Sequence, residues 1–250
     1  MNNSLRARAE YHLDHFKLRM SSFETLNTVA HPGFNPWLAY WYSDTGYCFI
    51  HIPKNGGTTV ERTLYGAKVG HRPWHEIHGL APLEYQRWLK FCIIRDPVDR
   101  FLSSFDYLNA GGRNPIDREV GRRFVSRFEP NSFLLQLDQD PEFRNQVLKY
   151  FHFRPQADYV LSGDGLCMVD RLLAFERLST ELGELLQIDN TAVGHHNKTK
   201  GERTSPSVLT AFSHSVIEKL YALDFELYNA LDGVQKNWYL QRFPSLYSAA

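Results

Sequence analysis

The sequence predicts an α/β fold in which a central, mainly parallel β-sheet is flanked by helices. Strand and helix patterns alternate from about residue 47 onward, as in folds built from strand–helix–strand units. Two short apolar runs, 47–52 and 91–94, are continuous rather than alternating, which is typical of central strands covered on both faces. The 250 residues, 43% of them hydrophobic, suffice for one sizeable core. We therefore expect a single domain over residues 1–250, in which residues 1–45 form an N-terminal arm or cover.

The other predicted elements follow these strands in chain order. A third strand is expected over 169–175. Proline stands at an early position of the helix that follows the second strand, where its missing N–H costs nothing. Near the C-terminus, apolar residues recur at helical spacing and give the last helix one apolar face. The predicted helices span 58–65, 82–89, 97–108, 179–187 and 213–231.

Charge and cysteine content exclude several classes of protein. Lys plus Arg and Asp plus Glu both total 28, so the net charge is zero and nothing global attracts nucleic acid or an acidic membrane surface. No apolar run approaches the roughly 18 residues of a membrane span, and the first residues lack a signal-peptide core. The three cysteines lie far apart and predict buried thiols rather than disulfides or a zinc knuckle: Cys48, Cys92 and Cys167. We expect a cytoplasmic protein without nucleic-acid or membrane partners.

The most informative segment is the turn between the first strand and the following helix, whose chemistry suits an anion. Glycines let backbone N–H groups turn inward, a helix N-terminus adds positive potential, and hydroxyls donate hydrogen bonds. A lysine at the start of the turn supplies a full charge. The residues of this predicted phosphate loop are Lys54, Asn55, Gly56, Gly57, Thr58 and Thr59. A plain strand-to-helix turn that uses glycine for its backbone conformation is the alternative.

A second cation follows the neighbouring predicted strand. Arg95 comes directly after the apolar run 91–94, and Ser103 lies about two turns into the following helix, so both suit a second phosphate. A structural role, with Arg95 paired to Asp99, is the alternative. In the loops of nucleoside triphosphatases the lysine follows the glycines, and a strand ends in an aspartate that holds magnesium. Here the lysine precedes the glycines and the second strand ends in Arg95.

Together these two segments resemble those of sulfotransferases that use 3′-phosphoadenosine 5′-phosphosulfate (PAPS). Residues 54–59 resemble their 5′-phosphosulfate loop, although Asn55 stands where the family commonly has threonine, and Arg95 with Ser103 resembles their 3′-phosphate motif. Three further segments are similar to the carbohydrate-type branch, sulfotransferase family 2, which includes heparan 2-O-sulfotransferases and bacterial relatives: 152–159, 170–176 and 221–228. The resemblance covers roughly residues 47–230 and implies a P-loop-like fold.

The resemblance implies an enzyme that moves a sulfuryl group from PAPS to a hydroxyl group and releases 3′-phosphoadenosine 5′-phosphate (PAP). Lys54 is expected at the bridging oxygen and the 5′-phosphate, and the amides and side chains of the rest of the loop at the 5′-phosphosulfate. Arg95 and Ser103 are expected at the 3′-phosphate, together with Lys198 from a late basic loop that is otherwise a solvated surface loop. Because a sulfuryl group carries less negative charge than a phosphoryl group, no metal is predicted.

A histidine between the two phosphate motifs is the expected base, because the pKa of histidine lies near neutrality. His71 matches the position of the catalytic histidine in the resembling proteins, and His75 is the reserve. A zinc site of three histidines would need an uninterrupted helix, which Pro73 argues against. His75, His152 and Arg154 are expected to contact the acceptor; the last two otherwise pack at the sheet edge.

The acceptor is predicted to be a carbohydrate or a small hydroxylated metabolite. Four arginines fall on one helical face that would suit an anionic sugar, although interleaved acidic residues favour a solvated surface: Arg118, Arg122, Arg123 and Arg127. Two other classes of function stay open. One is a P-loop nucleotide kinase, and the other is a nucleotide- or glycan-binding module that has lost turnover.

Overall fold

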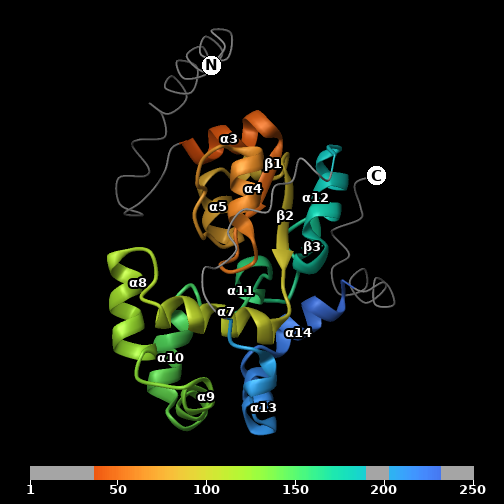
Figure 1. Ribbon diagram of the computed structural model, residues 1–250. Coiled ribbons are helices and arrows are strands. Elements are labelled where there is room, and N and C mark those ends of the chain that lie inside the picture. The colour runs from red at the N-terminus through yellow and green to blue at the C-terminus, as the bar shows by residue number, and fades with distance from the viewer. Residues whose placement is uncertain (1–36, 190–202, 232–250) are drawn as a thin grey trace. The chain divides into compact units, whose positions relative to one another are not determined.

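A computed structural model of the chain describes residues 37–189 and 203–231 (Figure 1). Three parallel strands form its sheet in the order β1-β2-β3: β1 (Tyr47–Ile50), β2 (Leu89–Ile94) and β3 (Arg171–Ala174). Phe49 of β1 pairs with Phe91 of β2, which in turn pairs with Arg171 of β3. Because the strands run in one direction, their carboxyl ends meet at one edge of the sheet, where ligands bind in folds of this class. The predicted α/β fold with a parallel sheet is confirmed.

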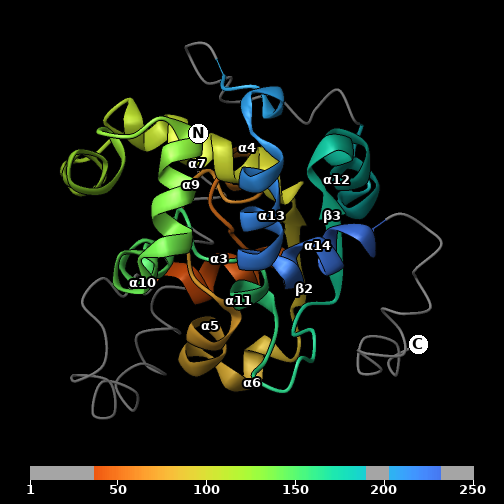
Figure 2. The ribbon, with the colours of Figure 1, turned by 90° about the horizontal axis from the view of Figure 1, so that it is seen from below.

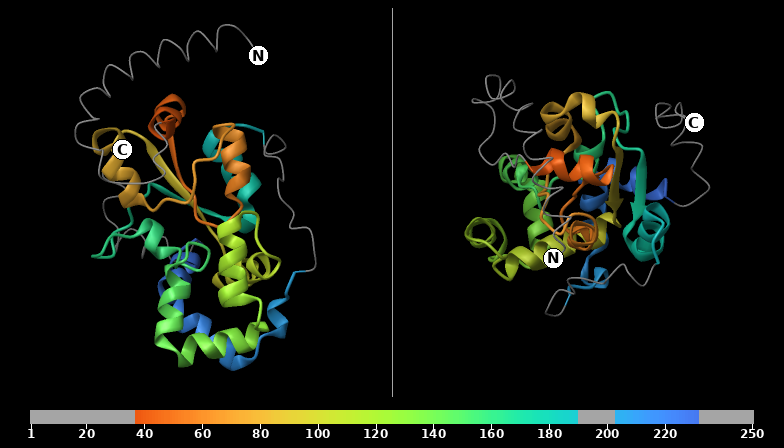
Figure 3. Two further views of the ribbon diagram at one scale, coloured as in Figure 1. Left: turned by 90° about the vertical axis from the view of Figure 1, so that its left-hand side faces the viewer. Right: turned by 90° about the horizontal axis from the view of Figure 1, so that it is seen from above.

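Helices connect the strands and cover them. They are α3 (Trp37–Thr45), α4 (Gly57–Leu64), α5 (Trp74–Leu80), α6 (Pro82–Tyr85), α7 (Pro97–Asn109), α8 (Pro115–Val120), α9 (Pro130–Gln139), α10 (Pro141–Lys149), α11 (Ala157–Val160), α12 (Leu178–Leu186), α13 (Ala211–Leu220) and α14 (Ala222–Asn229). A π-helical turn, Gly121–Val125, continues α8. Figure 3 shows α4 and α12 on one side of the strands and α5 on the other. None of the helices in the described ranges is long and apolar enough to cross a membrane.

Two hydrophobic clusters make up the interior. The first surrounds the sheet, where Phe49, Phe91 and Ile93 are at most 1% exposed, and it includes side chains of α3, α4 and α12. The second joins α7, α9, α10 and α13 around Phe101 and Phe133 (Figure 2). The burial of both runs confirms that β1 and β2 are covered on both faces. All three cysteines are buried and free, as predicted.

The end of the predicted N-terminal arm packs into the first cluster, and one predicted helix is shorter in the structure. Leu38 and Tyr42 of α3 are buried in the first cluster, and the Tyr42 hydroxyl donates to the Phe49 carbonyl at 3.1 Å. The chain is therefore part of the packed domain well before residue 45. The helix predicted over 82–89 ends at Tyr85, because the chain turns before β2 begins.

The long helix predicted over 213–231 is two helices, α13 and α14. It breaks at Tyr221, whose backbone leaves the helical region with φ −120° and ψ 30°. The break lets Asp224 turn inward, where its carboxylate accepts the backbone N–H groups of Gln156 and Ala157, both at 2.8 Å. This contact fixes the start of α11, and with it the segment that carries the predicted acceptor residues.

Candidate active site

The predicted phosphate loop lies at the carboxyl end of β1 and leads into α4. Lys54 and Gly56 both have left-handed backbone conformations, with φ of 71° and 76°. Glycine adopts this conformation freely, whereas a lysine in it stores about 1–3 kcal/mol of strain, which is typical of functional sites. α4 begins at Gly57, and Thr58 and Thr59 lie in its first turn. Because the first N–H groups of a helix lack carbonyl partners within it, this turn suits an anion.

Gly57 brings the loop very close to the His51 ring. A Cβ at Gly57 would lie 2.1 Å from that ring. His51 is 6% exposed, and its Nδ1 bonds to Glu61 Oε1 at 2.9 Å, so the ring cannot move away freely. Neither His51 nor Glu61 could be selected from the sequence, because a histidine at the end of a strand and a glutamate within a helix are both common and belong to no motif here.

Gly57→Ala is expected to destabilise the fold by about 1–3 kcal/mol, because the added methyl group must displace the buried His51 ring. Urea denaturation followed by tryptophan fluorescence measures the change. Gly79→Ala in α5 is the matched control: its Cβ would meet nothing within 4 Å, so stability should stay the same or rise slightly. Equal stability of the two variants would contradict the close approach.

The Lys54 side chain carries the charge of the loop and lies against α7. Its Nζ stands 4.2 Å from the centroid of the Tyr107 ring, within the range of a cation–π contact. Within the described residues, this ammonium has no carboxylate at ion-pair distance. Burial, followed by the nearby cations Arg95, Arg113 and Arg203, lowers the pKa of Lys54 to about 8. Cations therefore gather around the loop, as an anion site requires.

Arg95 joins this site from the end of β2. Its Nη1 donates to the Lys54 carbonyl at 3.0 Å, and its guanidinium lies 4.5 Å from the centroid of the Phe175 ring. No ion pair between Arg95 and Asp99 is formed in the described part of the chain, so the alternative pairing is absent there. Its Nε is buried and has no hydrogen-bond partner among the described residues. A buried charged donor without a partner is costly unless a ligand satisfies it.

Of three further residues predicted at the donor site, one side chain is placed differently in the structure. Asn55 is 1% exposed, and its Nδ2 donates to the Ile93 carbonyl and to Gln156 Oε1, both at 2.6 Å. The expectation that this side chain donates to a phosphate is therefore corrected: the amide ties the loop to β2 instead. Ser103 is half-buried on α7. Lys198 lies outside the described residues.

Arg203 is a cation of this site that sequence reasoning did not select. Its neighbour Thr204 donates from its backbone N and from Oγ1 to the carboxylate of Asp106 on α7, at 2.9 and 2.6 Å. These two hydrogen bonds to α7 hold the neighbouring Arg203 at a position where its positive charge lowers the pKa of both Lys54 and Arg95. No local motif signals it, because the contact depends on a residue nearly a hundred positions earlier in the chain.

His71, the predicted base, lies beside the loop among other rings. Its Nδ1 bonds to the His51 carbonyl at 3.3 Å, and its ring is 4.2 Å from the His51 ring and stacked on Phe151 at 5.2 Å. A carbonyl only accepts, so Nδ1 carries the proton and Nε2 keeps a lone pair. Burial, with the neighbouring His51 and His152, lowers the pKa of His71 well below its usual range. The ring is therefore neutral near pH 7 and able to accept a proton.

His75 and Arg154 lie apart from this cluster and share a groove. The groove has a volume of about 830 Å³ and is lined by α5, α10, α14 and the segment 154–165. His75 is exposed on α5, and Arg154 is half-buried. Neither Lys54 nor His71 lines this groove. The structure thus separates two of the predicted acceptor residues from the phosphate loop.

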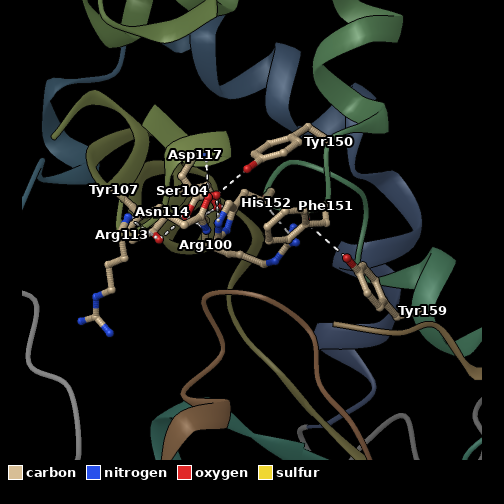
Figure 4. Close-up of polar contacts among 10 residues, drawn as sticks. All are labelled: Arg100, Ser104, Tyr107, Arg113, Asn114, Asp117, Tyr150, Phe151, His152 and Tyr159. Carbon is tan, nitrogen blue, oxygen red and sulfur yellow. Dashed lines mark hydrogen bonds and ion pairs between the residues drawn. The ribbon is translucent and has the colours of Figure 1, made fainter. Parts of the chain in front are cut away.

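His152 belongs to a buried network centred on Asp117 (Figure 4). Asp117 is 1% exposed and accepts hydrogen bonds from the hydroxyls of Tyr107 and Tyr150 and from Nδ2 of Asn114. His152 Nε2 lies 3.5 Å from the same carboxylate. Although burial opposes ionisation, these bonds hold the pKa of Asp117 well below its usual range. Of this network only His152 was selected from the sequence, because the other members lie in segments without a motif.

Two other candidate sites find little support. On the predicted basic face, Arg122 forms two bonds with Glu119, at 2.9 and 2.7 Å, and its side chain is 72% exposed. The helix also changes to a π-helical turn at Gly121, so a solvated surface is favoured. For metals, no group of three or more His, Cys, Asp or Glu side chains within 37–189 and 203–231 is placed to hold an ion.

Comparison with known proteins agrees with this geometry. The model of the sulfotransferase family matches residues 43–229. This range includes all three strands, the phosphate loop, Arg95, His71 and the Asp117 network. No curated protein and no solved structure matches the chain. Because the matched range covers well over half of the 250 residues and contains both cationic strand ends, the chain belongs to the sulfotransferase family.

Proposed function

We propose that the chain is a PAPS-dependent O-sulfotransferase, which moves a sulfuryl group from PAPS to a hydroxyl group of a carbohydrate or of a small hydroxylated metabolite. The observation that carries this proposal is the pair of linked cations at neighbouring strand ends. Lys54 follows β1, Arg95 follows β2, and the guanidinium of one donates to the carbonyl of the other at 3.0 Å. Family membership supports sulfuryl transfer as the reaction.

The residues present fit both charged ends of the donor. Lys54 and the N–H groups of the first turn of α4 suit the 5′-phosphosulfate, where negative charge develops on the bridging oxygen as it leaves. Arg95, whose buried Nε lacks a partner in the described residues, suits the 3′-phosphate, and Ser103 on α7 is a second proposed contact to it. Lys198 stays a proposed third contact to that phosphate. The product left in the site would be PAP.

His71 is the proposed base for the acceptor hydroxyl. Its Nδ1–H is held by the His51 carbonyl, so Nε2 is the nitrogen that takes the proton. Its lowered pKa keeps the ring neutral near pH 7. His75 is exposed and stays the reserve.

The groove that His75 and Arg154 line is proposed to hold a part of the acceptor remote from the reacting hydroxyl, because neither Lys54 nor His71 lines it. A groove of about 830 Å³ has the size of pockets that hold a sugar unit or a small metabolite. His152 is 5% exposed and turns Nε2 toward Asp117, so of the three predicted acceptor residues it is the least accessible.

Two measurements test the proposal. Calorimetry with PAP tests the donor site, and transfer of labelled sulfate from PAPS to a panel of carbohydrates and hydroxylated metabolites tests the reaction. We expect PAP to bind without magnesium and at least one acceptor to be labelled. Binding of magnesium-ATP without binding of PAP would favour a nucleotide kinase. PAP binding without any labelled product would favour a binding module that has lost turnover.

His71→Ala is expected to lower kcat by about a hundredfold with PAP affinity unchanged, because general-base catalysis contributes roughly 10²–10⁴ and the base does not touch the nucleotide. Arg95→Ala should instead weaken PAP binding, by about 1.5–3 kcal/mol for each charged hydrogen bond lost. His75→Ala tests the reserve base, and because His75 lines the proposed acceptor groove, its loss should mainly raise the KM for the acceptor. A near-normal rate in His71→Ala with a large loss in His75→Ala would move the base to His75, and unchanged PAP binding in Arg95→Ala would remove that arginine from the site.

A further inference from the structure

The buried network around Asp117 ends at the ring on which Lys54 rests (Figure 4). The Tyr107 hydroxyl donates to Asp117 Oδ2 at 2.5 Å, and the face of the same ring lies 4.2 Å from the Lys54 ammonium. Two contacts thus join the carboxylate to the ammonium through one side chain. Since no carboxylate of the described residues pairs with Lys54, this ring is the contact that holds its charge.

Hydrogen bonds from three segments of the chain hold the Asp117 carboxylate in one position. Its oxygens accept bonds from Tyr107 on α7, from Tyr150 directly after α10, and from Asn114 in the turn before α8. Gly112, with φ of 61°, brings that turn so close that a Cβ there would lie 2.2 Å from the Asp117 Cβ. A buried carboxylate with donors from three segments is rigid, because any displacement leaves a donor or an acceptor unsatisfied.

We propose that Asp117 is a positioning residue of the reaction, which fixes the Tyr107 ring and thereby holds the Lys54 ammonium at the phosphate loop. This inference rests on the proposed role of Lys54. A lysine side chain has four rotatable bonds and spreads its charge over many positions when nothing holds it. Stabilisation of a leaving oxygen needs that charge in place before the reaction begins.

The groups that face Lys54 determine whether a substitution raises or lowers its pKa. Burial and the cations Arg95, Arg113 and Arg203 favour the neutral amine, and Asp106 on α7 favours the ammonium. His152, whose own pKa is lowered by burial, is a neutral neighbour. The face of the Tyr107 ring attracts a cation and so also favours the ammonium. Removal of the ring should therefore lower the pKa of Lys54 further.

Tyr107→Leu, Tyr107→Phe and Tyr150→Phe separate positioning from simple stability. Tyr150→Phe is the matched control, because it removes a hydroxyl bond to the same carboxylate from a ring that shows no contact with Lys54 in the described residues. Competitive acylation followed by peptide mass spectrometry measures the pKa of Lys54 and needs neither acceptor nor turnover. Tyr107→Leu is expected to lower this pKa by roughly half a unit, and Tyr150→Phe to leave it unchanged.

Turnover supplies the second readout. Tyr107→Phe keeps the ring but frees it, so kcat should fall about tenfold with little change in the KM for the acceptor. Tyr150→Phe should lose similar thermal stability and much less kcat, and Asp117→Asn should behave like Tyr107→Phe. Equal losses of kcat in the two Phe variants, with the pKa of Lys54 unmoved in Tyr107→Leu, would overturn the proposal. Full activity of Lys54→Met would instead refute the proposed function, and the pKa measurement would still decide whether Tyr107 holds the lysine.

Discussion

Lys54→Ala is expected to lower kcat by about a thousandfold and to weaken PAP binding. The proposed role of Lys54 is to stabilise charge on the bridging oxygen as it leaves, and loss of one such donor from an enclosed site typically costs about 10²–10³ in kcat. Because the same ammonium also faces the 5′-phosphate before the reaction, affinity should fall together with rate. Transfer of labelled sulfate measures the rate, and calorimetry measures the affinity.

Two further variants isolate the charge of this lysine. Lys54→Met keeps an unbranched stem against Tyr107 and removes only the ammonium, so it should lose nearly as much kcat as Lys54→Ala. Lys68→Ala removes an exposed lysine shortly after α4 and should behave like the wild type. Equal activity of Lys54→Met and Lys68→Ala would exclude the proposed role.

The pH dependence follows from the same side chain. Only the ammonium form carries the charge, and burial lowers the pKa of Lys54 to about 8. The kcat/KM of the free enzyme should therefore be full well below this pH and fall as the pH rises through it. The corresponding fall in kcat should lie at higher pH, because a bound anion favours the ammonium. Lys54→Met should lack this alkaline limb.

Local sequence could predict the sheet and the two cations at its edge. The apolar runs 47–52 and 91–94 are continuous in the chain, and Lys54 and Arg95 follow them directly, so neighbouring strands bring these charges together. His71 could be chosen because it lies between the two motifs. These features can be predicted because they depend on residues that are close in the chain, within one strand, the turn after it and the next helix.

The rest of the site depends on contacts that no local pattern encodes. Tyr107 reaches Lys54 because α7 lies against the loop, and Asp117 reaches Tyr107 because the turn before α8 folds back onto α7. Arg203 is placed by Asp106 from a distant part of the chain. The pattern of the loop predicts a ligand contact for Asn55, but an amide donates equally well to an anion or to a carbonyl, and only the position of the neighbouring strand decides between them.

Arg100→Met is expected to destabilise the fold by about 3–5 kcal/mol. Arg100 is 2% exposed, and its guanidinium donates to the carbonyls of Pro53, Arg154 and His152 at 3.2, 2.9 and 3.4 Å. Methionine fills similar volume but leaves these buried acceptors unsatisfied, at about 1–3 kcal/mol for each. Burial raises the pKa of Asp224 to about 6 and the charge of Arg100 opposes this rise, so the change should raise the pKa of Asp224 further.

Arg122→Met makes the same replacement on an exposed arginine and should change the free energy of unfolding by less than about 1 kcal/mol. Urea denaturation compares the two variants. Arg100 also connects Pro53, directly before the phosphate loop, to the segment that carries His152, so the folded fraction of Arg100→Met should bind PAP more weakly than the Arg122→Met protein does. If both variants unfold at the same urea concentration and bind PAP equally, then the three carbonyl bonds of Arg100 do not hold the loop in place.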